Sequence, residues 1–129
     1  MNTKILMTSS SLILAVAGIF TLFAPDVLLS ALGVAVTAQL SVLVQLLGVL
    51  YFSFALMNWT AKDSAIGGIY ARPVSLANFS HFFSGTLLLG KYLLSNKFDL
   101  SILVISILYA TFAAVFYWLV FRATGLKAQ

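Results

Sequence analysis

Two polar residues, Asn78 and His81, stand three positions apart in a largely apolar stretch and would share one face of a helix. Gly85 lies on the same face one turn further on. An imidazole in such a place could relay protons, contact a ligand or ligate a cofactor. The structural alternative is a neutral histidine that hydrogen-bonds to a neighbouring helix. The chain has no second histidine, and no acidic residue within an apolar stretch, to act as a relay partner.

A second group of residues could bind phosphate at a membrane surface. Arg72 immediately precedes Pro73, which suits the first turn of a helix, so we expect this arginine at the level of the lipid headgroups. Trp59, Lys62 and Tyr70 fall at the same depth. Because a guanidinium can bind phosphate through two N–H groups, these residues are a candidate site for a headgroup or another anion. The alternative is simple anchoring, which is common at the ends of spans.

The preceding apolar stretch offers partners for these polar side chains. Gln45 lies within the hydrocarbon region and must find a hydrogen-bond donor or acceptor. If this stretch and the next are antiparallel neighbours, Asn58 approaches Asn78, and Tyr51 could reach His81 at mid-depth. These five residues form a candidate ligand-binding set.

Two faces of small residues predict close contacts between helices. One face, in the first apolar stretch, contains Ser11, Ala15 and Gly18. The other, in the last apolar stretch, contains Ser106, Ala110 and Ala114 at four-residue spacing. Either face could close one bundle or pair two copies of the chain.

No combination of residues predicts a catalytic or metal site. The chain has no cysteine, and its acidic residues are Asp26, Asp63 and Asp99. With one histidine they cannot form an ordinary metal site, although a single axial haem ligand stays open in principle. No serine has a histidine and an acid placed by a recognisable motif. We therefore expect no metal, no cofactor and no enzymatic activity, since an enzyme would have only His81 and Arg72 to use.

Composition indicates the elements that carry these residues. The chain has 129 residues, of which 62% are hydrophobic and 8% are charged, whereas about a quarter of a soluble protein is charged. Lipid is therefore the expected solvent. The length predicts a single domain, 1–129. A net charge of +4 is too sparse for nucleic-acid binding.

Four apolar stretches predict transmembrane helices at about 5–23, 40–58, 73–94 and 100–121. Each is close to the ~20 residues that a helix needs to cross about 30 Å of hydrocarbon. Pro25 and Asp26 start, and Gly33 ends, a short interfacial helix at about 26–32. Asp99 is expected to cap the last span. The predicted fold is an all-α, four-transmembrane-helix bundle with a short interfacial helix after the first span.

The charges in the loops predict the orientation of the chain. Five basic residues fall on one side of the membrane and two on the other: Lys4, Lys62, Arg72, Arg122 and Lys127 against Lys91 and Lys97. The positive-inside rule then places both termini in the cytoplasm of a multi-pass protein of a bacterial inner membrane.

The stretches GIFTLFAPDVLLSALG, LLGVLYFSFALMNW and GGIYARPVSLANFSHF resemble small four-span bacterial integral membrane proteins of the broad DoxX-like kind. The resemblance covers most of the chain, and it rests on glycines, the Ala-Pro-Asp turn and the Asn58-Trp59 pair. The order of Arg72 and His81-Phe82 is also similar to the ergosterol-biosynthesis scaffold protein, a four-span membrane tether. Both likenesses imply an architecture, and neither assigns an activity to particular residues.

These observations predict a non-enzymatic accessory or scaffold protein, or a bundle that holds a lipid or hydrophobic ligand in a polar pocket between the second and third spans. The alternative is a small oligomeric transporter or channel that uses His81, which needs a continuous polar file across the membrane. A membrane enzyme is the third hypothesis. The expected partners are membrane lipids, which a second copy of the chain or another membrane protein could join.

Overall fold

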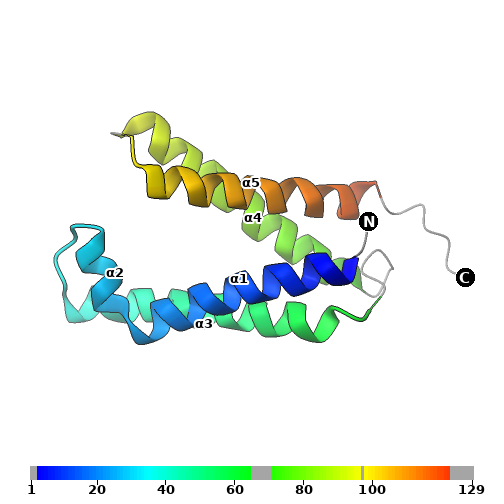
Figure 1. Cartoon of the computed structure of the whole chain (residues 1–129), viewed down its shortest axis with the longest axis horizontal. Helices are drawn as coiled ribbons and strands as arrows, with labels where there is room; N and C mark the ends of the chain where they lie inside the picture. Colours follow the sequence, from blue (N-terminus) through cyan, green and yellow to red (C-terminus); the bar gives the residue numbers. More distant parts are fainter. Residues whose placement is uncertain (1–2, 65–70, 97, 123–129) are drawn as a thin grey trace, which may run out of the picture. The chain divides into compact units, whose positions relative to one another are not determined.

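The computed structural model describes residues 3–64, 71–96 and 98–122 of the chain. This part is all-helical, with five helices: α1 (Thr3–Phe23), α2 (Pro25–Ala31), α3 (Ala38–Ala61), α4 (Arg72–Ser95) and α5 (Leu100–Phe121) (Figure 1). The predictions of an all-α fold and of a short helix after the first span are confirmed. The helices begin at most two residues away from the predicted positions, and α3 extends three residues beyond its predicted end.

Three of the helices, α1, α3 and α5, are long and apolar enough to cross a membrane. The chain is therefore a candidate multi-span membrane protein. The helix α4 has 24 residues, as many as α3, but it is not among the three. Its polar side chains, among them Ser75, Asn78 and His81, make it less apolar than the others.

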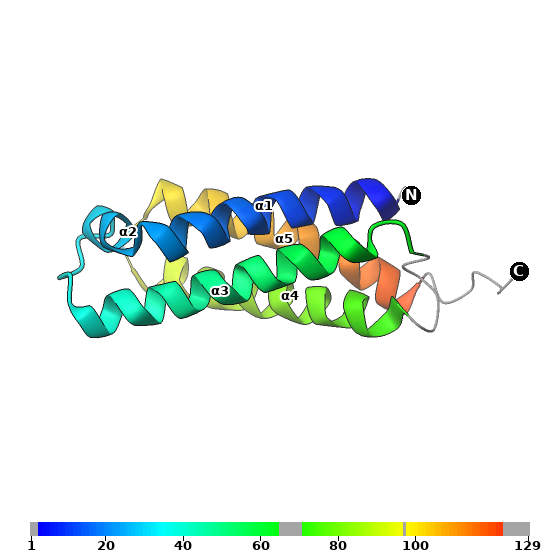
Figure 2. The same cartoon turned by 90° about the horizontal axis from the view of Figure 1, so that it is seen from below.

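The chain divides into two compact units, residues 1–63 and 64–129. In the first unit α1 and α3 lie side by side as an antiparallel pair, and α2 connects them (Figures 1 and 2). In the second unit α4 packs against α5. The single domain that the chain length predicts stays a prediction.

Local signals account for the turn between α1 and α3. Pro25 occupies the first turn of α2, where a backbone N–H would have no partner within the helix, so proline loses no hydrogen bond there. Asp26 follows in the same turn. Gly33 ends this segment with a φ of 69°, a conformation that glycine adopts without a steric penalty. Its N–H donates to the Ser30 carbonyl at 3.0 Å. The chain thus reverses between the two long helices over residues 24–37, which include α2.

Two side-chain caps fix the starts of α3 and α5. The Thr37 hydroxyl accepts a hydrogen bond from the Leu40 N–H at 3.3 Å. The Asp99 carboxylate accepts from the Ser101 N–H at 2.8 Å and from the Ile102 N–H at 3.2 Å, which confirms the predicted cap. Each cap satisfies backbone donors that the first turn of a helix leaves free.

The face of α5 that is buried in the described chain does not include Ala110 and Ala114. Ala110 and Ala114 are exposed, whereas Phe112 and Phe116 are buried. The expectation that Ser106, Ala110 and Ala114 mark a close contact between helices is not met by the packing of α5 on α4, and it stays a prediction for contacts outside the second unit. Since every face of α5 is apolar, its pattern does not distinguish a face that packs from one that meets lipid.

Candidate functional site

Gly18 of α1 and Gly48 of α3 bring the two backbones of the first unit into close contact. A Cβ atom added at Gly18 would lie 2.7 Å from the Phe52 nitrogen and 2.9 Å from the Gly48 oxygen. One added at Gly48 would lie 2.7 Å from the Leu22 nitrogen. Only glycine allows this approach, which is how small residues drive helix association in membranes. The predicted small face of α1 is thus a seam within the chain.

Hydrogen bonds between side chains and the facing helix follow the same seam. The Ser11 hydroxyl donates to the Ala55 carbonyl at 2.8 Å. The Asn58 Nδ2 donates to the Ser10 hydroxyl at 3.0 Å, and both side chains are fully buried. The Gln45 Nε2 donates to a carbonyl at 3.1 Å, that of Leu22 in α1.

Gln45 and Asn58 therefore have a structural role, because each of these bonds gives a polar side chain a partner within an otherwise apolar helix pair. The requirement that Gln45 find a partner is met, and that partner is in α1. Tyr51 is half-buried on α3, and its predicted approach to His81 stays a prediction. The pocket predicted between the second and third spans draws on both units and also stays a prediction.

Two polar contacts hold the ends of the α1–α3 pair. The Ser41 hydroxyl donates to the Asp26 carboxylate at 2.5 Å, which ties α2 to the start of α3. At the other end the Lys4 ammonium lies 2.7 Å from the Asp63 carboxylate. The hydrogen bond from Lys4 holds the pKa of the Asp63 carboxyl below its usual range. Both partners are largely exposed, so solvent screens this pair and it adds little to stability.

Of the four predicted headgroup residues, Trp59 and Lys62 are in contact. The Lys62 ammonium lies 3.5 Å from the centroid of the Trp59 ring, a cation–π geometry. Arg72 begins α4 in an exposed position, as expected for an anchor. Tyr70 lies outside the described residues, as do Lys97 and Lys127 of the orientation argument.

In the second unit the ring of Tyr109 covers Gly85, and its hydroxyl reaches His81. A Cβ atom added at Gly85 would overlap the Cδ1 and Cε1 atoms of this ring, so the ring can lie there only because residue 85 has no side chain. The hydroxyl is 3.3 Å from His81 Nε2. Depending on the tautomer, either the hydroxyl donates to Nε2 or the Nε2–H donates to the hydroxyl oxygen. We call His81, Gly85 and Tyr109 the His–Tyr site.

An aromatic core fixes the His–Tyr site between α4 and α5. The ring of Phe82, which is only 1% exposed, stacks on Phe112 at a centroid distance of 4.8 Å. It also meets Tyr109 edge-on at 5.2 Å and His81 at 5.0 Å. Close ring packing of this kind adds to the stabilisation from burial. The imidazole is therefore positioned by rigid neighbours on both helices.

Asn78, the other predicted polar residue of α4, is fully buried. Its Nδ2 donates to the Val74 carbonyl one turn earlier at 2.9 Å. This bond gives one N–H of the side-chain amide a partner within its own helix. Asn78 and His81 share a face of α4, as their spacing predicts, and they remain the candidate ligand-binding residues of the second unit.

Sequence reasoning missed two residues that make these contacts, namely Ser10 and Tyr109. Ser10 stands in a run of three serines, which by itself does not show that its hydroxyl accepts a hydrogen bond from another helix. For Tyr109 a signal was present. Gly85 lies one turn after His81, and a missing side chain beside an imidazole on the same helix face leaves room for a ring from a neighbouring helix.

Comparisons with protein-family models, with curated proteins and with solved structures find no match to this chain.

Proposed function

We propose that the chain is a non-enzymatic integral membrane protein with four spans, α1, α3, α4 and α5. Support for α4 as the fourth span comes from its length of 24 residues and from the absence of charge between Arg72 and Lys91. It also packs against α5, a candidate span. Its polar side chains are acceptable in lipid because Asn78 and His81 have hydrogen-bond partners.

The excess of basic residues on one side supports an orientation with both termini in the cytoplasm of a bacterial inner membrane. With four spans the N- and C-termini lie on the same side. The proposed architecture agrees with the resemblance to DoxX-like four-span proteins.

Within this architecture we propose that the protein holds a lipid or another hydrophobic ligand at the His–Tyr site, as an accessory or scaffold protein. One observation carries the proposal: the imidazole of His81 is placed among aromatic rings and beside the Tyr109 hydroxyl. Binding sites for hydrophobic ligands combine apolar walls with a few polar groups that fix orientation. By contrast, the hydrogen bonds of Gln45 and Asn58 serve the α1–α3 seam.

The test is retention of a ligand by variants of the His–Tyr site. Native mass spectrometry of the protein released from native membranes should show a stoichiometric hydrophobic molecule, which His81→Ala loses. Tyr109→Phe keeps the ring over Gly85 but removes the hydroxyl, so it should weaken retention by about tenfold, the effect of one hydrogen bond to a ligand.

The outcome that contradicts the proposal is a lower melting temperature in both variants with no change in any bound molecule. The site would then be a structural contact between α4 and α5. If wild-type protein in liposomes instead carried ions or solutes, and His81→Ala abolished that flux, the transporter hypothesis would replace ligand binding.

A further inference from the structure

Three charged side chains lie at the end of the α1–α3 pair where α1 begins and α3 ends. The Lys4 ammonium lies 2.7 Å from the Asp63 carboxylate, and the Lys62 ammonium lies 3.5 Å from the centroid of the Trp59 ring. Because two lysines face one aspartate, this end of the first unit has an excess of positive charge. We call Lys4, Trp59, Lys62 and Asp63 the Lys–Trp site.

Lys62 keeps its positive charge uncompensated, because Lys4 is the ion-pair partner of Asp63. The hydrogen bond from Lys4 is the main cause that lowers the pKa of the Asp63 carboxyl, and attraction to Lys62 is the weakest. Within the described part of the chain, no carboxylate forms an ion pair with Lys62. Its ammonium instead lies over the Trp59 ring, which attracts a cation without neutralising it. A further anion can therefore meet the charge of Lys62.

The side chains on one side of α3 change from apolar to aromatic to cationic as the helix ends. Leu56, Trp59 and Lys62 follow one another at three-residue spacing, so neighbouring members lie side by side on the helix surface. Leu56 is 52% and Trp59 is 45% exposed. In membranes, tryptophan lies at the level of the headgroups, and lysine extends beyond it toward water. This order matches the order of the parts of a phospholipid, from acyl chain to glycerol to phosphate.

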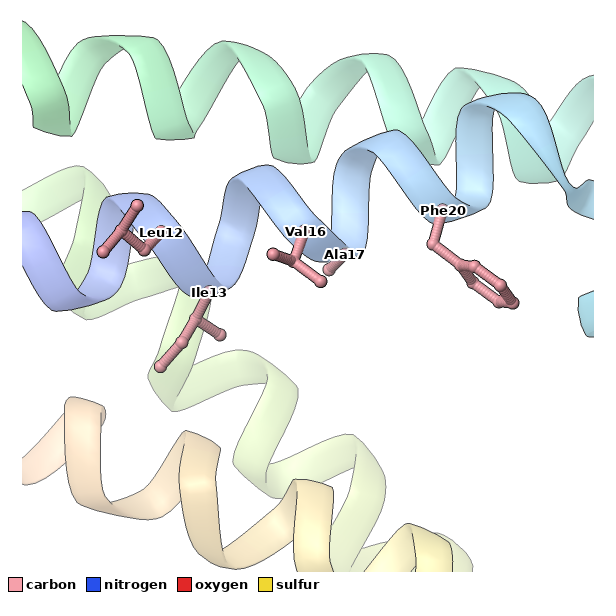
Figure 3. A pocket seen from close by; sticks show the side chains of 5 residues that line it. All are labelled: Leu12, Ile13, Val16, Ala17 and Phe20. Atoms are coloured by element: carbon pink, nitrogen blue, oxygen red, sulfur yellow. The ribbon is translucent and has the colours of Figure 1, made fainter.

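The hollow along α1 lacks any group that could select a headgroup. Its volume is about 450 Å³, and its lining consists of hydrocarbon side chains, those of Leu12, Ile13, Val16, Ala17 and Phe20 (Figure 3). Hydrocarbon walls accept any acyl chain. In the first unit, selection between lipids must therefore come from charged groups such as those of the Lys–Trp site.

We propose that the Lys–Trp site binds the phosphate of an anionic phospholipid of the phosphatidylglycerol type. The Lys62 ammonium donates to the phosphate oxygens, and Trp59 lies against the glycerol. The pairing of Asp63 with Lys4 removes a negative charge that would repel the phosphate. A zwitterionic lipid binds less well, because its own ammonium meets an end of the same sign. The site rests on the proposed membrane location of the chain and not on ligand binding by His81.

The test measures the preference for phosphatidylglycerol over phosphatidylethanolamine. Full-length protein, freed of native lipid in mild detergent, is mixed with equal amounts of the two palmitoyl-oleoyl lipids, and bound lipid is counted by native mass spectrometry. Wild type should prefer the anionic lipid about fivefold, the effect of one lysine near an anionic surface. Lys62→Gln should remove this preference. The matched control is Lys91→Gln, which removes the same charge from α4 and should keep it.

Variants of Asp63 and Lys4 test the site without changing Lys62. Asp63→Asn should raise the preference about fivefold further, since it removes the one negative charge at this end. Lys4→Gln removes the partner of Asp63, so the carboxylate is left to oppose the phosphate and the preference should disappear. The double variant Lys4→Gln with Asp63→Asn should restore it, which a general loss of positive charge would not do.

Equal retention of the two lipids by wild type, or the same loss of preference in Lys62→Gln and Lys91→Gln, would overturn the proposal. Displacement of the bound lipid by inorganic phosphate would also overturn it, because the occupant would then be a free anion. His81→Ala should leave the preference unchanged, so the result is independent of ligand binding at the His–Tyr site.

Discussion

Replacing Gly18 or Gly48 with alanine should strongly destabilise the α1–α3 pair. The added methyl group would lie 2.7 Å from a backbone nitrogen in either case, that of Phe52 or that of Leu22. A backbone atom cannot move aside by changing rotamer, so the two helices must separate. Overpacking of a core costs about 1–3 kcal/mol when side chains can adjust. Here we expect a cost at or above the upper end of that range.

Gly90→Ala is the matched control, because a Cβ atom at Gly90 meets no atom within 4 Å. Alanine is favoured over glycine in a helix by about 1 kcal/mol, so this variant should be as stable as wild type or more so. Thermal unfolding in detergent, followed by far-ultraviolet circular dichroism, measures all three variants. If Gly18→Ala and Gly90→Ala melt at the same temperature, the close approach of α1 and α3 is refuted.

Asn58→Leu should lower stability by about 1–2 kcal/mol, because it breaks a buried hydrogen bond between two apolar helices. Asn58 is completely buried, and its Nδ2 donates to the Ser10 hydroxyl at 3.0 Å. Leucine branches at Cγ as asparagine does but is larger, so the effect reports the lost bond and some overpacking, and no cavity. The Ser10 hydroxyl keeps its bond to the Met7 carbonyl, which limits the cost. Unfolding free energies of the variants measure this effect.

A double-mutant cycle with Ser10→Ala isolates the bond between these two residues. The effects of Asn58→Leu and Ser10→Ala should combine to less than their sum. Ser53→Ala serves as the control, since the Ser53 hydroxyl is exposed and donates only to the Val49 carbonyl of its own helix. Strictly additive effects of Asn58→Leu and Ser10→Ala would show that the α1–α3 seam does not depend on this contact.

The sequence was sufficient to predict the helices, because local chemistry determines where they begin and end. Pro25 and Gly33 bound the short helix, and Asp99 caps the last one. Long apolar stretches predicted the candidate spans. The small face of α1 was also predictive, since Gly18 and Ser11 are the residues that α3 contacts.

The partners of the polar residues could not be predicted in the same way. Gln45 and Asn58 share a stripe of α3 whatever helix that stripe faces, so spacing alone does not distinguish α1 from another span. For α5 the face that packs on α4 could not be predicted for a related reason. Its small and its aromatic residues are all apolar, and lipid accepts both, so only the packing of Phe112 and Phe116 around Phe82 decides which face is buried.

The central claim is that α4 crosses the membrane as a fourth span. The chain has no cysteine, so single cysteines introduced at Val34, Ser64 and Asn96 can be labelled in intact cells without background from other thiols of the same chain, once the protein is purified for readout. With four spans, a membrane-impermeant thiol reagent should label positions 34 and 96 from outside and position 64 only after permeabilisation. Labelling of positions 64 and 96 from the same side would show that α4 does not span the bilayer, and would contradict the account.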